Sequence, residues 1–354
     1  MIVGGGPAGL STWLHLNKVN PKLAEKTILI EKEKYPRDKI CGGALGEFTK
    51  GILKQLNIDL KFPAVAIHTL EYKFKDKIFK RKQKNFFSIV ERSNFDYFLA
   101  KIAINRGAMI NENEAFIDFD RRNDCLKVKT NKQTYRTKIL IGADGSLSNV
   151  RRKIRHLEKS HLAVALEIFS FVNPNEENEY KNNTAVIDFT PISEGIQGYL
   201  WHFPCIKKGR PAINHGIGDF RVFEIKEKTK LKTYFENILK ERNISINQKN
   251  WLGAPIRYLS SDSIISEPNI LLVGDAAGID PLLGGGIQLS LWYGDLAALE
   301  ICTALENNNF TFESYRKKLN EHILGKYIIH MTNIANKMYS KPENTVECIK
   351  SIFG

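Results

Sequence analysis

The chain has 354 residues, of which 43% are hydrophobic and 26% charged, which excludes a disordered or collagen-like chain and allows a large buried core. Lysine and arginine outnumber aspartate and glutamate by 52 to 39, and the resulting charge of +13 raises nucleic acid and anionic membrane as partners. No apolar run reaches the roughly 18 to 20 residues of a membrane-spanning helix, so any membrane contact is expected to be peripheral.

The cysteine pattern favours a reducing compartment, and we expect a cytoplasmic protein. The cysteines are odd in number and scattered, without a CxxC pair, which argues against a disulfide framework or a zinc site: Cys41, Cys125, Cys205, Cys302 and Cys348. None of the histidines has metal-ligand spacing, so no metal is expected. A glycine motif at the fourth residue argues against a leader segment, although Met1 falls inside the first strand and the natural start could lie upstream.

The first motif is G-x-G-x-x-G at the N-terminus. A short strand precedes the glycines, a helix follows over Ala8–Val19, and a second strand over Thr27–Ile30 ends at Glu31. Such a turn brings backbone N–H groups against a pyrophosphate at the helix N-terminus, and an acid some 20 residues further on accepts hydrogen bonds from a ribose. The motif therefore predicts a dinucleotide site.

Further elements follow in chain order. Val65–Phe79 alternates as a hairpin that leads into a basic run ending at Lys84, and Phe95–Ala108 has helical spacing. Strands are predicted over Phe116–Phe119, Leu126–Thr130, Leu166–Val172, Ala185–Phe189, Tyr199–Phe203, Ile213–Ile217 and Ile270–Val273, and helices over Leu231–Arg242, Gly286–Leu305 and parts of 313–340. A second basic run, Arg151–Arg155, is read as a solvated face, or as a contact for anionic lipid or a phosphorylated ligand.

These elements predict an α/β fold in which a dinucleotide domain is interrupted by a β-rich domain. The cofactor domain is expected to comprise 1–62, 88–158 and 262–306, the substrate domain 63–87 and 159–261, and a helical tail 307–354. Two later glycine and acid motifs, at Gly142–Gly145 and Gly274–Ala277, also follow predicted strands. Because the carboxyl ends of parallel strands meet in one crevice, all three motifs are expected around one long ligand.

At this point the sequence resembles the flavoprotein hydroxylase and reductase superfamily. Arg92–Leu99 is similar to its R-x-x-F-D-x-x-L element, and the three glycine motifs resemble those that hold its FAD. The resemblance implies an FAD-binding Rossmann-like domain of the glutathione-reductase type, interrupted by a mixed β-sheet substrate domain and followed by a short helical tail.

Within this superfamily the chain resembles the geranylgeranyl reductase family. Tyr35–Leu45 is similar to its P-R-x-K-x-C-G-G motif, Gly198–Pro204 to its Y-x-W-x-F-P motif, and Asp275–Ile287 to its G-D-A-A-G…P…G-G-G-I stretch. The chain departs from the family at Ile196 and Gln197, which replace a proline and glycine, and at Cys205, which replaces a lysine. Both departures lie near the expected substrate pocket and leave the substrate's identity open.

The resemblance implies the following site. The residues expected to hold FAD are Gly4, Gly6, Pro7, Ala8, Gly9, Glu31, Lys32, Cys41, Gly42, Gly43, Ala44, Arg92, Asp144, Gly274, Asp275, Pro281, Gly284, Gly285, Gly286 and Ile287. The helix from Ile287 would aim its positive end at the flavin. The residues expected in catalysis are Cys41, Tyr199 and Trp201.

Two alternatives stay open for these catalytic residues. Cys41 is either a thiol that donates a proton at the flavin or a small packing residue, and Cys205 is a second thiol candidate. Tyr199 and Trp201 lie two apart on a strand and share a face, either as a wall over an apolar substrate or as ordinary core aromatics.

The implied reaction is reduction of C=C bonds in an isoprenoid or other long apolar polyene, with NADPH or NADH as a transient electron donor. The basic faces leave open a contact with anionic membrane, whereas no nucleic-acid motif accompanies the charge. One alternative is an FAD-dependent monooxygenase, either a hydroxylase or a halogenase, acting on an aromatic or polyketide-like substrate. Another is a flavin-bound scaffold without turnover. The sequence leaves the oligomeric state undetermined.

Overall fold

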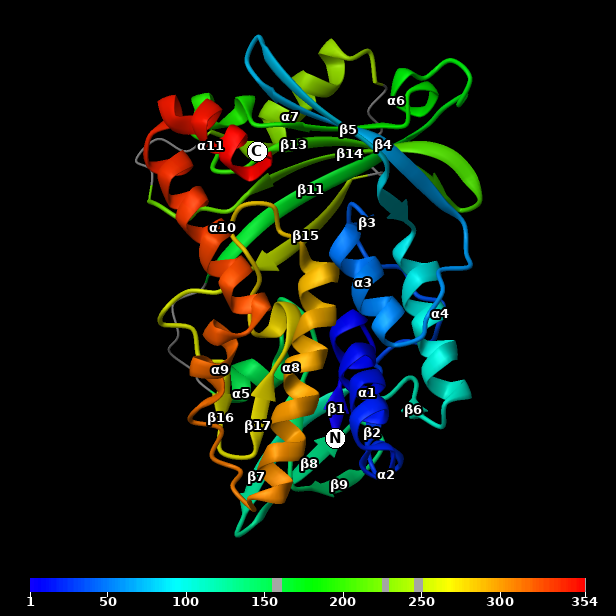
Figure 1. Cartoon of the computed structure of the whole chain (residues 1–354), viewed down its shortest axis with the longest axis vertical. Helices are drawn as coiled ribbons and strands as arrows, with labels where there is room; N and C mark the ends of the chain where they lie inside the picture. Colours follow the sequence, from blue (N-terminus) through cyan, green and yellow to red (C-terminus); the bar gives the residue numbers. More distant parts are fainter. Residues whose placement is uncertain (155–160, 225–228, 245–250, 354) are drawn as a thin grey trace.

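The computed structural model describes residues 1–154, 161–224, 229–244 and 251–353, and within them two large sheets lie one above the other along the long axis (Figure 1). Arg155 and the predicted domain boundary after residue 158 lie outside the described residues. The lower sheet in Figure 1 carries the glycine motifs, and the upper sheet carries the Tyr199 and Trp201 motif.

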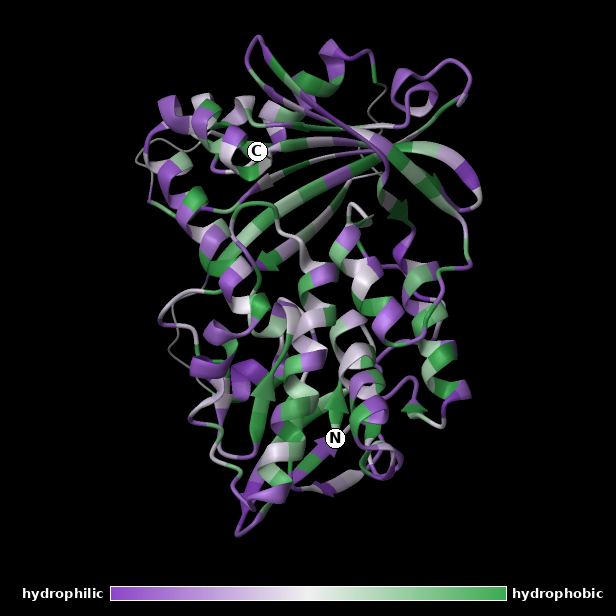
Figure 2. Cartoon of the chain, viewed as in Figure 1, coloured by the Kyte–Doolittle hydropathy of each residue, from purple (hydrophilic) through white to green (hydrophobic). Residues whose placement is uncertain are grey.

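The first sheet has the strand order β16-β17-β10-β1-β2-β6 and is parallel except for the β16–β17 pair. Its strands are β1 (Ile2–Val3), β2 (Ile28–Ile30), β6 (Met109–Asn111), β10 (Leu140–Gly142), β16 (Ser266–Glu267) and β17 (Ile270–Leu272). The central strands are buried throughout, as expected when helices cover both faces of a parallel sheet. Figure 2 shows them as hydrophobic segments inside the molecule.

Helices and a small sheet surround this layer. The helices are α1 (Pro7–Val19), α2 (Pro21–Glu25), α4 (Arg92–Asn105), α5 (Asn149–Ile154) and α8 (Gly286–Glu306), and the small antiparallel sheet joins β7 (Phe116–Arg122), β8 (Cys125–Thr130) and β9 (Thr134–Thr137). Helix α1 packs closely on α8, because Gly294 has no side chain and the Ser11 hydroxyl donates to the Leu291 carbonyl at 2.7 Å. Both helices that follow glycine motifs therefore lie side by side.

The second sheet has the order β15-β11-β14-β13-β12-β4-β5-β3 and is antiparallel except between β12 and β4. Its strands are β3 (Ala44–Leu45), β4 (Ala64–Phe74), β5 (Lys77–Val90), β11 (Leu162–Phe171), β12 (Thr184–Asp188), β13 (Leu200–Lys207), β14 (Arg210–Asp219) and β15 (Leu252–Arg257). Around it lie α3 (Glu47–Gln55), α6 (Asn178–Lys181), η1 (Thr190–Glu194) and α7 (Leu231–Glu241). Helix α7 packs over one face of this sheet, where Phe235 and Leu239 join a buried cluster with Ile217.

The C-terminal helices run along one side of both sheets (Figure 1). They are α9 (Tyr315–Glu321), α10 (Ile323–Ser340), η4 (Pro342–Asn344) and α11 (Thr345–Phe353). Met331, Met338 and Tyr339 of α10 are buried in the same apolar cluster as Trp201. The predicted tail thus completes the core beneath the second sheet.

Several predicted elements need correction. The helix predicted over Phe95–Ala108 is α4 at Arg92–Asn105, because the chain enters the helix at Glu91 and leaves it before Gly107, whose φ is +97°. The hairpin predicted over Val65–Phe79 is much longer, since β5 continues to Val90. Its lysines lie on the exposed first half of β5, which β3 does not reach. Arg151 is buried rather than solvated.

Candidate functional site

The glycine turn between β1 and α1 has no room for side chains. Gly4 has φ +104°, and a Cβ there would lie 2.4 Å from the Ala143 carbonyl oxygen; a Cβ on Gly9 would lie 2.0 Å from the Gly4 oxygen. Helix α1 starts at Pro7 with no side-chain cap and no acid in its first turn. Free backbone N–H groups at the positive end of a helix fit a pyrophosphate.

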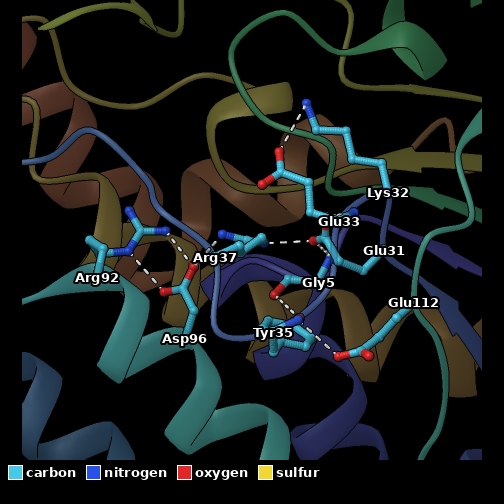
Figure 3. A network of polar contacts seen from close by, with 9 residues as sticks. All are labelled: Gly5, Glu31, Lys32, Glu33, Tyr35, Arg37, Arg92, Asp96 and Glu112. Carbon is cyan, nitrogen blue, oxygen red and sulfur yellow. Dashed lines mark hydrogen bonds and ion pairs between the residues drawn. The ribbon is translucent and has the colours of Figure 1, made fainter.

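Glu31, at the end of β2, faces this turn. Its carboxylate accepts the N–H of Gly5 at 2.9 Å and that of Glu33 at 3.1 Å, and only 4% of the residue is exposed. Lys32 is exposed and pairs with Glu33 at 3.7 Å (Figure 3). The turn and Glu31 are therefore together, as a ribose site requires, while Lys32 stays a prediction.

A buried charge network extends from Glu31 to α4 (Figure 3). Arg37 pairs with Glu31 at 3.2 Å and with Asp96 at 3.1 Å, and Asp96 also holds Arg92 by two contacts of 2.8 Å. Burial lowers the pKa of each arginine, but the carboxylates outweigh it and raise the pKa above the usual value. Both guanidinium groups stay charged, and that of Arg37 lies beside the glycine turn, 3.7 Å from a Cβ on Gly6, as suits a phosphate-bearing cofactor.

Sequence reasoning had assigned no role to Arg37 or Asp96, although both lie inside motifs that it quoted. Arg37 follows Tyr35 and Pro36 in the cysteine-containing motif, and Asp96 is the acid of the R-x-x-F-D element. The motifs contain both residues, but they do not show that the two side chains are in contact. The fold brings Arg37 and Asp96 together as an ion pair.

The other two glycine motifs lie beside the first because β10 and β17 are its neighbours in the sheet. Gly274 has φ +60°, and a Cβ there would lie 2.6 Å from Cβ of Ala8 in the first turn of α1. Asp275 accepts the Ser146 hydroxyl at 3.0 Å, and its Oδ1 would lie 3.1 Å from a Cβ on Gly286. The three strand ends thus share one crevice, as predicted.

Asp144 is occupied within its own loop. Its carboxylate accepts the backbone N–H of Asn149 at 2.7 Å and of Val150 at 3.1 Å, and also the Ser148 hydroxyl, at the start of α5. Burial raises its pKa against these hydrogen bonds. Arg151 of α5 donates to the Ala276 carbonyl at 2.9 Å and so holds the third motif in place.

The loop before α8 is organised by Asp280, which sequence reasoning missed. This fully buried carboxylate accepts four backbone N–H groups at 2.6 to 3.2 Å, those of Leu282, Leu283, Gly284 and Gly285. Gly284 has φ +61°, and α8 begins at Gly286 without an acid in its first turn. An aspartate just before a proline is the sequence signal for such a turn. Ile287 is the second residue of α8, and Pro281 lies in the loop before it.

Cys41 lies between the two sheets. Its thiol contacts the Arg92 guanidinium and accepts the backbone N–H of Gly43 at 3.4 Å. A Cβ on Gly42 would lie 3.4 Å from the Phe203 ring and 3.6 Å from the Trp201 indole nitrogen. Gly43 has φ +76°, and its carbonyl accepts the backbone N–H of Val90 at 2.9 Å. The next residue, Ala44, pairs with Ile89 and so begins β3 of the second sheet.

The aromatic motif faces this loop. Tyr199 precedes β13 and its ring centroid is 6.0 Å from that of Trp201; its hydroxyl donates to the Leu283 carbonyl at 2.6 Å. Burial raises the pKa of Tyr199, so the phenol stays protonated. Cys41, Tyr199 and Trp201 therefore lie on one side of the second sheet.

Cys205 lines the same small cavity as Cys41, Arg92 and Asn214. It is 4% exposed, and burial raises the pKa of its thiol to about 12. Among the described residues, no group of three or more His, Cys, Asp or Glu side chains could hold a metal ion. Within the same residues, no helix has both the length and the apolar character needed to cross a membrane.

No family model matches the chain. A digeranylgeranylglycerophospholipid reductase of Thermoplasma acidophilum is 27% identical over 357 residues, covering 93% of this chain and 79% of that protein. Digeranylgeranylglycerophospholipid reductase 3 of Methanosphaera stadtmanae is 27% identical over 367 residues, covering 98% and 88%. The match therefore spans both sheets and the C-terminal helices.

Solved structures agree on the fold. A geranylgeranyl bacteriochlorophyll reductase-like protein of Thermoplasma acidophilum superposes with a TM-score of 0.74 at 22% identity, covering 96% of this chain and 91% of that one. The flavin-dependent halogenase CmlS gives 0.67 at 17% identity, covering 95% and 62%. The reductase relatives, together with this fold and the three converging glycine motifs, support an FAD-dependent oxidoreductase. Over nearly its whole length the chain is similar to members of the geranylgeranyl reductase family of these enzymes.

Proposed function

We propose that this protein reduces C=C double bonds of an isoprenoid lipid or another long apolar polyene. The observation that carries the proposal is the position of the Cys41 loop, which lies against Trp201 and Phe203 on one side and Arg92 on the other. Relatives named as digeranylgeranylglycerophospholipid reductases match nearly the whole chain. A thiol beside an aromatic wall fits protonation of an apolar alkene.

The residues at the crevice fit FAD. The glycine turn and the start of α1 would hold the pyrophosphate, Glu31 the ribose, and Asp275 with the start of α8 the flavin end. When bound, FAD supplies the hydride chemistry, and NADPH or NADH is the proposed source of its electrons. Asp280 keeps the Gly284–Gly286 backbone in one conformation by holding its N–H groups.

The chain's own residues would then orient the alkene and supply its proton. Tyr199 and Trp201 form the wall against which the double bond lies, and the burial of Trp201 keeps water from this part of it. The Cys41 thiol donates the proton from Sγ to one alkene carbon, and the thiol is reprotonated from solvent afterwards. Arg92, held by Asp96, fixes the position of Sγ.

The experiment combines cofactor binding with product mass. The purified protein should be yellow or should become so with FAD, and after anaerobic reduction it should add hydrogen to a geranylgeranyl lipid. A protein that cannot be loaded with FAD contradicts the proposal. So does a product that gains mass only when oxygen or halide is present.

An FAD-dependent monooxygenase is the second candidate, because solved structures of a flavin-dependent halogenase and of PqsL share this fold. CmlS has a TM-score of 0.67, and PqsL of Pseudomonas aeruginosa in complex with 2-aminobenzoylacetate has 0.70 at 14% identity, covering 96% of this chain and 95% of that one. The oxygen-dependent arm of the same experiment would reveal this activity.

We also propose peripheral contact with anionic membrane through the exposed cations of β5, chiefly Arg81, Lys82 and Lys84. Figure 2 shows much of β5 in the colour of hydrophilic residues. Such binding should weaken with salt, since exposed charges are screened. Sedimentation with vesicles that contain or lack phosphatidylserine measures it, and equal binding to both vesicle types would contradict it.

A further inference from the structure

A buried carboxylate that the proposed reaction does not use lies on β11. Glu167 is 3% exposed, and its register partner on β14 is Gly216, which in turn pairs with Trp201 on β13. Directly opposed residues of neighbouring antiparallel strands point to the same face. Glu167 and Trp201 therefore share the face that looks toward Cys41.

Gly216 lets the indole lie across the strand between them. A Cβ at this position would lie 2.0 Å from the Trp201 ring, so only glycine leaves space for it. The tryptophan ring thus occupies the place of the missing side chain. The ring and the Glu167 side chain therefore lie on the same face, with Gly216 between their backbones.

Asn214 links the indole, the carboxylate and the cysteine loop. Its Oδ1 accepts the Trp201 Nε1–H at 3.0 Å, and its Nδ2 donates to Glu167 at 3.1 Å and to the Cys41 carbonyl at 3.4 Å. An indole N–H can only donate and a carboxylate or carbonyl oxygen accepts, so each end of the amide has the partners it needs. The residue is 1% exposed.

Glu167 holds the other backbone polar group of Cys41, its N–H. Burial raises the pKa of its carboxyl, while hydrogen bonds from Asn214 and from the backbone N–H of Cys41 oppose this shift. Cys41 lies in a loop, where strand pairing cannot supply these partners. Its N–H is therefore held by Glu167 and its carbonyl by Asn214.

We propose that Glu167 and Asn214 are positioning residues, which fix the Cys41 backbone and the Trp201 indole relative to each other so that the thiol points at the alkene. The inference deepens the proposed function and rests on it. Neither residue touches the reacting atoms. Asn214 on β14 binds both Glu167 on β11 and Trp201 on β13. Glu167 and Asn214 also bind the backbone of the loop that contains Cys41.

The variants are Glu167→Ala, Glu167→Gln and Asn214→Leu, with Glu71→Gln as the matched control. Glu71 is also a buried glutamate of this sheet, 8% exposed, but it pairs with Lys73 and Lys80. The glutamine at position 167 keeps an acceptor oxygen of similar reach. We therefore expect it to restore most of what alanine loses.

The first readout needs no turnover. Alkylation of Cys41 by iodoacetamide is followed by peptide mass spectrometry on the FAD-loaded protein. Its rate should change severalfold in Glu167→Ala and Asn214→Leu, and should match the wild type in Glu71→Gln and nearly so in Glu167→Gln. Unchanged alkylation in variants that are folded and hold FAD would overturn the proposal.

The second readout separates the two half-reactions. Flavin reduction by dithionite should stay unchanged in all variants, whereas reoxidation by the alkene should slow by about 10 to 100-fold in Glu167→Ala and Asn214→Leu. In a Cys41→Ala background, Glu167→Ala should add little further slowing. Equal slowing with and without the thiol would mean that Glu167 does not act through Cys41.

Two further outcomes are assigned in advance. If Glu167→Ala does not fold, Glu167→Asp withdraws the carboxylate by one methylene and should still change Cys41 alkylation, while no change would overturn the proposal. If the wild type shows no alkene-dependent reoxidation, the proposed function fails. The alkylation series still decides whether Glu167 and Asn214 position Cys41.

Discussion

The two large sheets contribute to the site in different ways. The first sheet presents backbone groups at its strand ends, where Gly4, Gly9 and Gly274 admit no side chain. The second sheet presents side chains from its face, where Glu167 and Asn214 meet Trp201. A cofactor site made of backbone groups can therefore be predicted from local sequence motifs. A wall of side chains can be predicted only when the register of the strands is known.

The largest effect is expected from adding a methyl group to the glycine turn, which tests whether the backbone of the first sheet holds FAD. Gly9→Ala places a Cβ 2.0 Å from the Gly4 oxygen, and neither backbone can yield without moving the turn. We expect loss of FAD binding, measured as flavin absorbance of the purified protein. Gly51→Ala is the control, because a Cβ there meets nothing within 4 Å and the change should not weaken FAD binding. Normal flavin content in Gly9→Ala would contradict the account.

The second prediction concerns the opposite face of the second sheet, where His202 and His215 contact each other at 2.7 Å. Burial lowers the pKa of His215 from 6.5 to about 3, and it lowers that of His202 as well. A base whose folded pKa is depressed takes up protons first in the unfolded state. Its contribution to stability is therefore complete above pH 6.5 and falls as the pH drops toward 3.

For His215 alone the loss reaches about 5 kcal/mol, at about 1.4 kcal/mol per pKa unit. Urea unfolding at stepwise pH measures it, and His215→Gln should remove much of the slope between pH 6.5 and pH 3. His330→Gln, at an exposed position, serves as the control. An identical slope in wild type and His215→Gln would show that the imidazole is not buried neutral.

The third prediction tests the charge network of the cofactor side. Asp96 is fully buried between Arg37 and Arg92, so Asp96→Asn leaves two cations with less compensation. We expect a loss of about 3 kcal/mol in the free energy of unfolding. Asp118→Asn breaks the exposed pair with Lys153 and should cost less than about 1 kcal/mol. Equal losses would mean that the network contributes no more than a surface pair.

The smallest expected effect separates the two thiols. Cys205 lines the same cavity as Cys41 but is 4% exposed, and burial raises the pKa of its thiol to about 12. Cys205→Ala should slow alkene reduction far less than the roughly 100-fold that loss of a general acid produces. The measurement is the steady-state turnover of Cys41→Ala and Cys205→Ala, each compared with the wild type. A larger loss at position 205 would reverse the assignment.

The sequence predicted the cofactor side well because its signals are local. The helices over Pro7–Val19 and Gly286–Glu306 match their predicted ranges closely, and the three glycine motifs converge as parallel strand ends require. Asp144 follows β10 in the same acid-after-strand pattern, and its carboxylate caps α5. Its predicted contact with FAD stays a prediction.

The substrate side could be predicted only in outline. Tyr199 and Trp201 were recognised from their motif, but Glu167 and Asn214 lie in strands with no motif of their own. Their meeting depends on the β11–β14–β13 register, and that register is set by pairing across long sequence separations. Alternation alone assigns a face, and it does not say which residue of another strand lies opposite.

The most direct test of the account is anaerobic reoxidation of the reduced, FAD-loaded protein by a geranylgeranyl lipid. The wild type should be reoxidised as the lipid gains hydrogen, and Cys41→Ala should keep its FAD but react about 100-fold more slowly. Reoxidation that requires oxygen, or an unchanged rate in Cys41→Ala, would contradict the assignment of this site as an alkene reductase with a cysteine proton donor.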